Sequence, residues 1–346
     1  MLIKQKQYFV QNNCNLICSI GGGVKNLVMR FDMRRPPDCS VSDQVRYQAA
    51  LEMAVWAEGN GFDTIGLSEH HVTADGYLSS PLMLAMAIAS RTERIAINVG
   101  ALLLPLHEPL RIAEDIAVLD MIAKGRAAVT AGIGYRPEEY AALGRDWERR
   151  GELLDEGIEV LLKAWRGQPF EYRGRSAQVL PRPVSRVQQL LYVGGNSKAA
   201  ARRAAHFGLV FLPAIDDPEL VTAYQAECER LGGKRGFVVL PNAPATTFIA
   251  EDVEQGWRDY GPAMLFDAVA YGAWHHPNRR AYAESFASDM ASLRAEGKYR
   301  ILTPAQAVEV IRSTGSLHIA PLVGGADPAL AWRSLQLFAE HVLPQL

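Results

Sequence analysis

The stretch IAINVGALLLPLHEPLRIAEDIAVLDMIAKGRAAVTA, residues 95–131, predicts a strand, a helix and a second strand. Its two ends, Ile95–Val99 and Ala127–Ala131, are short runs of β-branched and small apolar residues, which is typical of strands buried on both faces. Between them, Pro109–Met121 has the apolar spacing of a helix, and Gly125 follows it as a helix-ending residue. The two strands should run parallel, because parallel strands need a crossover of this length.

The same alternation continues along most of the chain. Apolar runs predict further strands at Leu27–Phe31, Thr64–Leu67, Leu190–Val193, Leu209–Leu212, Phe237–Leu240 and Leu317–Pro321. Helical patterns separate most of them, at Asp43–Glu58, Leu78–Ser90, Arg150–Trp165, Ser197–His206, Pro218–Leu231 and Pro328–His341. Strands alternating with helices predict an α/β fold, and their number favours a (β/α)8 TIM barrel.

Two stretches, Gly144–Gln189 and Trp257–Arg300, are longer than a simple crossover. We expect them to be insertions near the C-terminal face, where the loops after barrel strands build active sites. The rival fold is an open doubly wound sheet. Its dinucleotide fingerprint would have to be Gly132–Pro137, where proline replaces the third glycine, so the barrel is favoured.

Composition narrows the function classes. The chain has 346 residues, 49% of them hydrophobic, and a formal net charge of -2, so no basic surface for nucleic acid is indicated. No apolar run is long enough for a membrane helix. The cysteines Cys14, Cys18, Cys39 and Cys228 fit neither a zinc-finger nor a disulfide pattern, and a cytoplasmic location is expected. Residues 1–28 differ from the rest and are expected to be an extension or a misassigned start, followed by one domain over residues 29–346.

Glu69, His70 and His71 directly follow the second predicted strand. An imidazole at this end of a barrel strand can transfer protons near neutral pH, and a neighbouring carboxylate can fix its tautomer. The alternative is a histidine that only forms hydrogen bonds in the core. A zinc site is disfavoured, because adjacent side chains of an extended segment point to opposite faces and no third ligand has suitable spacing. His275 and His276, in an aromatic region, are weaker candidates.

Two glycine-containing segments complete the candidate site. Gly194-Gly195-Asn196-Ser197 joins a strand to a helix, where backbone amides can hold a phosphate, although a tight turn with a helix cap would have the same sequence. Gly100 and Ala101 end the third strand, where small residues leave room for a planar ligand; an ordinary buried strand is the alternative.

In this order, the segments resemble the luciferase-like monooxygenase family, from about Met29 to the C-terminus. The motifs that carry the resemblance are Gly61-Phe-Asp63, Ser68-Glu-His-His71, Pro105-Leu-His-Glu-Pro-Leu-Arg111, Lys124-Gly-Arg126, Gly132-Ile-Gly-Tyr135, Glu139-Tyr140 and Val193-Gly-Gly195. The resemblance implies a barrel that binds a reduced flavin, either FMN or the deazaflavin F420.

The resemblance also assigns roles to single positions. His70 matches the family's active-site histidine, beside Glu69 at the cofactor, and Gly100–Ala101 matches a non-prolyl cis peptide behind the flavin ring. Gly194, Gly195, Asn196 and Ser197 match the phosphate site, with Arg150 as the expected phosphate arginine. Gly132 occupies a flavin-proximal position that is cysteine in true luciferases, so light emission is not expected. Glu69-His70 stands where many F420-dependent members have Asp-His, which favours FMN.

The expected function is therefore a two-component monooxygenase. Reduced FMN would come from a separate flavin reductase and react with dioxygen to oxygenate a small organic substrate, and a homodimer is expected from the family. The alternatives are an F420-dependent hydride-transfer enzyme and a non-catalytic flavin-binding relative. A metal-dependent hydrolase would rest only on the Glu-His-His cluster, and no metal is predicted.

Overall fold

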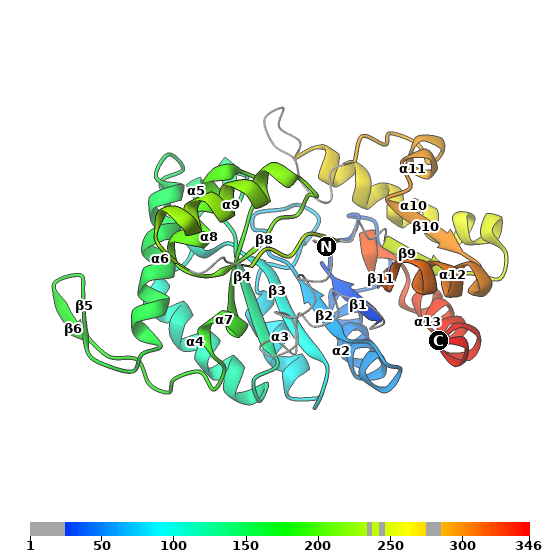
Figure 1. Ribbon diagram of the computed structural model, residues 1–346. Helices are drawn as coiled ribbons and strands as arrows, with labels where there is room; N and C mark the ends of the chain where they lie inside the picture. The colour runs from blue at the N-terminus through cyan, green and yellow to red at the C-terminus, as the bar shows by residue number, and fades with distance from the viewer. Residues whose placement is uncertain (1–24, 234–236, 242–245, 275–284) are drawn as a thin grey trace, which may run out of the picture.

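The main sheet has nine parallel strands in the order β10-β9-β11-β1-β2-β3-β4-β7-β8, with helices packed outside it (Figure 1). This computed structural model describes residues 25–233, 237–241, 246–274 and 285–346. The strands are β1 Asn26–Phe31, β2 Thr64–Leu67, β3 Ala96–Leu102, β4 Ala127–Ala131, β7 Leu191–Gly194, β8 Val210–Leu212, β9 Thr246–Ile249, β10 Tyr299–Leu302 and β11 Ser316–Ile319. The predicted α/β barrel class is confirmed.

The helices follow the strands in alternation. They are α2 Asp43–Gly59, α3 Pro81–Ala89, α4 Pro109–Ile122, α5 Pro137–Ala142, α6 Arg150–Ala164, α7 Val187–Leu190, α8 Lys198–His206, α9 Pro218–Arg230, α10 Val253–Gly272, α11 Met290–Glu296, α12 Pro304–Thr314 and α13 Pro328–Leu337. Serine, threonine and aspartate side chains cap several of them; Ser42 accepts the Val45 amide at the start of α2, for example. In the part of the chain that the structure describes, no helix has the length and apolar composition to cross a membrane.

The seventh predicted strand differs from the structure. Phe237–Leu240 forms only a bridge between Val238 and Phe211 of β8. Two strands that were not predicted, β9 and β10, pair with each other and connect to β11. Each has only four residues, too few for its alternation to stand out, and the first two residues of β10 fall in the stretch predicted to be an insertion, Trp257–Arg300.

The barrel begins three residues before the predicted domain boundary at residue 29. β1 starts at Asn26, which pairs with Ser316, and Leu27 pairs with Leu317 of β11. Leu27 is buried in the core. Residues 26–28 therefore belong to the first strand. The predictions for residues 1–24, and those for His275 and His276, lie outside the described residues.

The two long stretches form separate features. The first contains α5, α6 and the antiparallel hairpin of β5 (Phe170–Tyr172) and β6 (Arg175–Ala177), which projects from the barrel in Figure 1. The tip of the hairpin contacts the start of α4 through an ion pair between Arg173 and Glu108 of 3.0 Å. The second forms α10 and α11, and α10 supplies side chains to the site described below.

The two faces of the sheet have different chemistry. Alternate residues of β1, such as Leu27 and Met29, are buried against the surrounding helices. The residues between them point the other way, and there Arg30, Gly66 and Asn98 lie side by side in register. A Cβ at Gly66 would stand 3.0 Å from the Cγ of Arg30, so glycine leaves space for the arginine. The inner face is thus polar where it approaches the strands' C-terminal ends.

Candidate functional site

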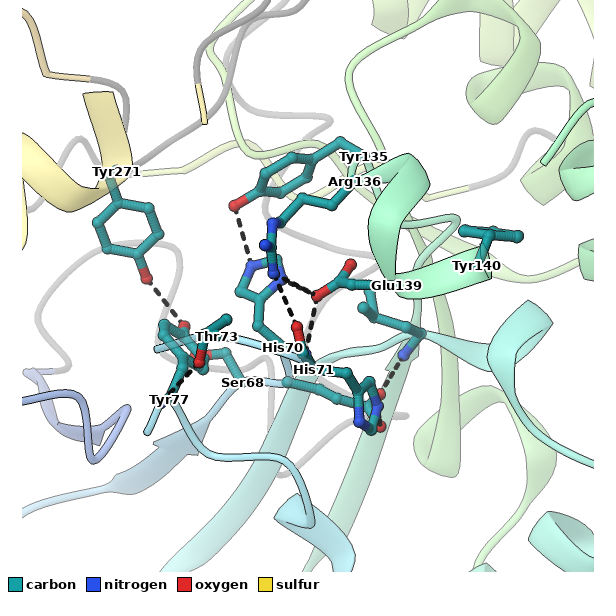
Figure 2. A network of polar contacts seen from close by, with 12 residues as sticks. Ser68, His70, His71, Thr73, Tyr77, Tyr135, Arg136, Glu139, Tyr140 and Tyr271 are labelled. Carbon is teal, nitrogen blue, oxygen red and sulfur yellow. Dashed lines mark hydrogen bonds and ion pairs between the residues drawn. The ribbon is translucent and has the colours of Figure 1, made fainter. Parts of the chain in front are cut away.

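The centre of the site is His70, in the loop after β2. Its side chain is only 7% exposed, and both ring nitrogens have partners. Nδ1 lies 2.9 Å from Oε1 of Glu139, and Nε2 lies 2.9 Å from the hydroxyl of Tyr135 (Figure 2). Tyr135 and Glu139 both follow β4, so two neighbouring barrel loops build this chain of hydrogen bonds.

Glu139 is a buried carboxylate at the first turn of α5. Besides His70, its Oε1 accepts the backbone N–H of His71 at 2.8 Å and a guanidinium N–H of Arg136 at 3.3 Å. An oxygen that already accepts two N–H groups also acts as an acceptor toward Nδ1 of His70. His70 must then carry its proton on Nδ1, which leaves the Nε2 lone pair to accept the Tyr135 O–H.

Aromatic rings cover His70. The ring centroids of Trp274 and Tyr77 are each 4.8 Å from that of His70, and Tyr135 is at 5.0 Å. Burial lowers the pKa of His70, and the carboxylate of Glu139 reverses only part of this effect. The imidazole is therefore neutral at physiological pH.

Helix α10 is fixed above this pocket by an ionic and an aromatic contact. Arg34, after β1, forms ion pairs with Asp75 at 2.8 Å and Asp267 of α10 at 3.1 Å. Its guanidinium also lies over the rings of Tyr271 and Trp274, at 4.2 and 4.4 Å from their centroids. These contacts hold Trp274 close to His70 and keep water away from the imidazole.

His71 points to the other side of the same segment. Its Nε2 is 2.9 Å from Oε1 of Glu69, and Nε2 of His107, from the loop after β3, is 2.6 Å from the same oxygen. The second carboxylate oxygen accepts the backbone N–H of Leu103. Burial alone would raise the pKa of Glu69, but the hydrogen bonds from His107 and His71 lower it to about 2. Burial lowers the pKa of His71, yet its bond to Glu69 outweighs this and raises it above the usual value.

Glu69, His71 and His107 also have ligand atoms within 4.8 Å of one another, a spacing that a metal ion can use. His107 is a third candidate ligand that sequence spacing did not reveal. Both imidazoles, however, are already hydrogen-bonded to one carboxylate oxygen. Hydrogen bonding accounts for the cluster, which clamps the loops after β2 and β3 together, and we assign no metal to it.

The predicted cis peptide is present between Gly100 and Ala101 in β3. Gly100 is exposed, although its strand is otherwise largely buried. Gly132, after β4, lies directly beside it, where a Cβ would be 2.6 Å from the Cβ of Ala101. A side chain at position 132 would force β3 or β4 to shift, which is a steric reason for glycine there.

The segment Gly194–Ser197 joins β7 to α8. Gly195 has φ +140, and a Cβ there would be 2.7 Å from that of Ala200, so glycine is required on both counts. Ser197 is the N-cap of α8, and its Oγ accepts the Ala200 amide at 3.2 Å. The side-chain oxygen of Asn196 accepts the Ala214 amide at 2.7 Å, which ties the turn to the loop after β8.

Arg150 begins α6 and stacks on Trp147, with its guanidinium carbon 4.1 Å from the ring centroid. It also donates to the Trp147 carbonyl at 2.8 Å. Helix α6 meets α8 through Arg203, which pairs with Asp155 and donates to the Gly151 carbonyl. The predicted phosphate role of Arg150 remains a prediction, because these contacts engage it with Trp147.

The sequence profile of the luciferase-like monooxygenases matches residues 29–317, most of the chain. The chain belongs to this family.

Two solved structures resemble this chain over nearly its whole length. Monooxygenase RslO1 from Streptomyces bottropensis has a TM-score of 0.70 and 25% identity, over 92% of this chain and 99% of that one. The oxygenating constituent of 3,6-diketocamphane monooxygenase from Pseudomonas putida, in complex with FMN, has a TM-score of 0.69 and 20% identity, over 94% and 99%.

An F420-dependent glucose-6-phosphate dehydrogenase from Microbacterium testaceum (strain StLB037) is 29% identical over 194 residues, 52% of this chain and 57% of that protein. In sequence, the chain spans about half the length of the curated relatives that it matches. Membership of this family fits a cofactor of the flavin or F420 type and leaves the choice between the two open.

The residues of this luciferase-like site fit a flavin. Gly100 and Gly132 leave backbone rather than side chain at the ends of two adjacent strands, as the approach of a planar ring requires. At the start of α8, Ser197 uses its oxygen as an acceptor toward Ala200 and keeps its O–H as a donor. The free amides of this first turn suit a phosphate. Both carboxylate oxygens of Glu69, by contrast, are engaged by protein donors.

Sequence reasoning placed His70 at the centre but missed its partners. Tyr135 and Glu139 appeared only as family motif positions, and His107 only within a longer motif. Trp274 and Tyr271 come from helix α10 and the residues directly after it, far along the chain. The available signal was the position of these residues after neighbouring strands. His107 follows β3, which lies beside β2, and Tyr135 follows β4, which lies beside β3. Both therefore lie at the same end of the barrel as His70.

Proposed function

We propose that the protein is an FMN-dependent monooxygenase of the two-component type, which receives reduced FMN from a separate flavin reductase and oxygenates a small organic substrate with dioxygen. The observation that carries this proposal is the pair of glycines, Gly100 and Gly132, which keep side chains away from the ends of β3 and β4, beside the strand that leads to the buried His70. The likeness to the FMN-bound oxygenating constituent of 3,6-diketocamphane monooxygenase supports it.

Different residues of the chain would hold different parts of the cofactor. Gly100, Ala101 and Gly132 would hold the flavin ring, and the Gly194–Ser197 turn, together with Arg150, would hold the phosphate. Bound reduced FMN supplies the electrons that activate dioxygen. His70, neutral and covered by Trp274, would exchange a proton with the reacting groups while water is kept out.

Cofactor titration tests the proposal directly. Purified protein is titrated with reduced FMN, oxidised FMN and F420, and binding is followed by fluorescence and absorbance. Preferential binding of reduced FMN, followed by substrate-dependent oxygen uptake, is the expected result. Binding of none of the three, or binding of reduced FMN without oxygenation of any member of a substrate panel, would leave a non-catalytic relative as the better description.

Ser197→Asp tests the phosphate position. Aspartate is as good an N-cap as serine, so α8 should keep its stability, while the added charge repels a phosphate. We expect the Kd for reduced FMN to rise by about tenfold or more, equivalent to about 1.4 kcal/mol. The matched control is Ser42→Asp, which changes the N-cap of α2 in the same way. Equal affinities for the two variants would contradict the phosphate site.

F420-dependent hydride transfer is the second candidate, supported by the F420-dependent relative from Microbacterium testaceum and by a likeness in fold to an F420-dependent secondary alcohol dehydrogenase. The same titration separates the two candidates. Preference for F420 and substrate oxidation without oxygen uptake would replace the monooxygenase proposal.

A homodimer is also proposed, from the surface of α3 and α4. Helix α3 has the sequence PLMLAMAIA, which is apolar on every side, and Met83 on it is 71% exposed. Val118, Met121 and Ile122 of α4 are exposed as well, and α3 packs beside α4. A helix that is apolar all round is normally buried, so a second copy of the chain is the proposed cover. Sedimentation equilibrium at low protein concentration tests this.

The proposed location is the cytoplasm. Cys39 and Cys228 are free thiols in the described structure, which suits a reducing compartment. Such a compartment would also be the place where a reductase can deliver reduced flavin before it is oxidised. Fractionation of cells producing the protein would test the location.

A further inference from the structure

We propose that the hydroxyl of Tyr135 is the group through which His70 exchanges protons with the reacting atoms, and that Glu139 positions His70 for this exchange. This inference rests on the proposed function, because it assigns roles within the same site. It makes Tyr135 the catalytic residue at the front of the chain of hydrogen bonds, His70 the proton store behind it, and Glu139 a positioning residue.

Both ring nitrogens of His70 already have hydrogen-bond partners. Nδ1 is bonded to Glu139 and Nε2 to Tyr135, both at 2.9 Å, so neither nitrogen is directed at a ligand. The histidine is buried, whereas Tyr135 is half-buried. A proton that leaves or reaches Nε2 in this arrangement passes through the Tyr135 oxygen.

The resting hydrogen bonds set the direction of proton transfer. Glu139 accepts from Nδ1 of His70, the imidazole is neutral, and Tyr135 donates to Nε2. A reacting group can release a proton to the Tyr135 oxygen while the phenol proton moves to Nε2. The reacting group's bond to its proton and the original phenol O–H bond break, while a new phenol O–H bond and an N–H bond at Nε2 form, so tyrosine ends unchanged and His70 becomes an imidazolium. The reverse steps return the proton.

The charges around His70 favour storing the proton on its imidazole rather than forming the phenolate of Tyr135. The imidazolium that forms is bonded to the carboxylate of Glu139, which stabilises its charge. Arg136 and Arg34 are the positive groups that face His70 and oppose the charge. The phenolate of Tyr135 is strongly disfavoured, because burial raises the pKa of Tyr135 well above its usual range. Tyrosine therefore relays the proton and does not keep the charge.

Tyr135→Phe is the decisive variant, since it removes one oxygen and keeps the ring against His70 and Trp274. The matched control is Tyr140→Phe, in which the lost hydroxyl is bonded to the carbonyl of Ile133 in the same loop. In protein loaded with reduced FMN, the rate of reoxidation by dioxygen is measured. We expect a decrease of about 100-fold for Tyr135→Phe and less than about threefold for the control.

The second measurement needs no cofactor. In ligand-free protein with 15N-labelled histidine, the ring signals of His70 are identified by their loss in His70→Ala and are followed against pH. Wild type should show one tautomer, with the proton on Nδ1. Tyr135→Phe should shift the Nε2 signal, and Glu139→Gln should lower the pKa of His70 further, because the carboxylate that raises it is gone.

The outcomes separate this inference from the proposed function. If wild type binds no reduced FMN, the proposed function fails, while the NMR result still reports on the relay. If wild type binds and reoxidises FMN but Tyr135→Phe stays within about threefold of it, the relay through Tyr135 is wrong. If Glu139→Gln leaves the tautomer and the pKa of His70 unchanged, the positioning role of Glu139 is wrong.

Discussion

His70 and His71 leave the chain on opposite sides of the segment after β2, and each joins a different cluster. His70 lies among the rings of Trp274, Tyr77 and Tyr135, where burial lowers its pKa. His71 shares the carboxylate of Glu69 with His107, and this contact raises its pKa. Two neighbouring residues of the same type therefore have opposite protonation tendencies, set by the side of the strand end on which each lies.

The difference suggests a division of labour. The His70 side is a dry pocket suited to proton exchange, and the Glu69–His71–His107 side is a clamp that fixes two loops. The first should matter for turnover and the second for stability.

Replacing each histidine by alanine should separate the two sides. His70→Ala should lower coupled turnover by about 10² to 10⁴-fold, because the proton store behind Tyr135 is lost, while reduced FMN still binds. His71→Ala should keep turnover within about tenfold. The measurement is substrate oxygenated per reduced FMN consumed. An equally large loss in His71→Ala, at unchanged free energy of unfolding, would contradict the division.

Glu69→Ala should destabilise the fold. The change leaves two imidazoles and the Leu103 amide without their acceptor, and we expect the free energy of unfolding to fall by about 2–4 kcal/mol in denaturant titrations. Glu52→Ala, at an exposed carboxylate of α2, is the control and should change it by less than about 0.5 kcal/mol.

The free energy of unfolding measured at acid pH should reveal the same stabilising contribution of Glu69. The pKa of Glu69 falls from an ordinary value of 4.5 to about 2 in the folded chain, so its stabilisation is present above pH 4.5 and is lost as the pH falls through 2. Glu69→Ala should lack this loss. A clamp that contributed nothing would give parallel curves for wild type and variant.

The smallest effect concerns the pH dependence of stability near neutrality. The raised pKa of His71 means that the folded state binds more protons, so its contribution is present below pH 6.5 and is lost as the pH rises through the folded value. The lowered pKa of His70 has the opposite sign, and its penalty grows as the pH falls below 6.5. Each effect is at most about 1.4 kcal/mol per pH unit.

Unfolding free energies between pH 5 and 8 would check both signs. The stability difference between wild type and His71→Ala should shrink as the pH rises, and the difference between wild type and His70→Ala should shift in favour of wild type. Slopes of the same sign would show that the pKa values of the two imidazoles shift in the same direction, contrary to the opposite shifts expected here.

Much of the fold could be predicted because its signals are local. β2 and β4 have the residue bounds expected from their apolar runs, and α2 and α4 begin where predicted. β9 and β10 were missed because a four-residue strand carries little alternation, and their partners lie far apart in sequence. The single bridge at Val238 shows the converse: an apolar run does not become a strand without a neighbour in register.

For the site, the sequence supplied positions but not contacts. His70 followed from its place directly after the second predicted strand, the cis peptide at Gly100–Ala101 followed from the resemblance, and the cis peptide is confirmed. The partners Glu139 and Tyr135 are more than sixty residues from His70 in sequence. Their meeting depends on the order of the strands in the barrel, which a local pattern cannot specify.

The pairing of β1 with β11 has a practical consequence for anyone who trims this chain. A version that starts at Met29, where the family match begins, would lose the partners of Ser316, Leu317 and His318. Most of this edge of β11 would then be unpaired, and exposed edges are templates for pairing between molecules. Such a version should precipitate even where the rest of the barrel folds. A cut made before Lys25 would instead keep the pairing between β1 and β11.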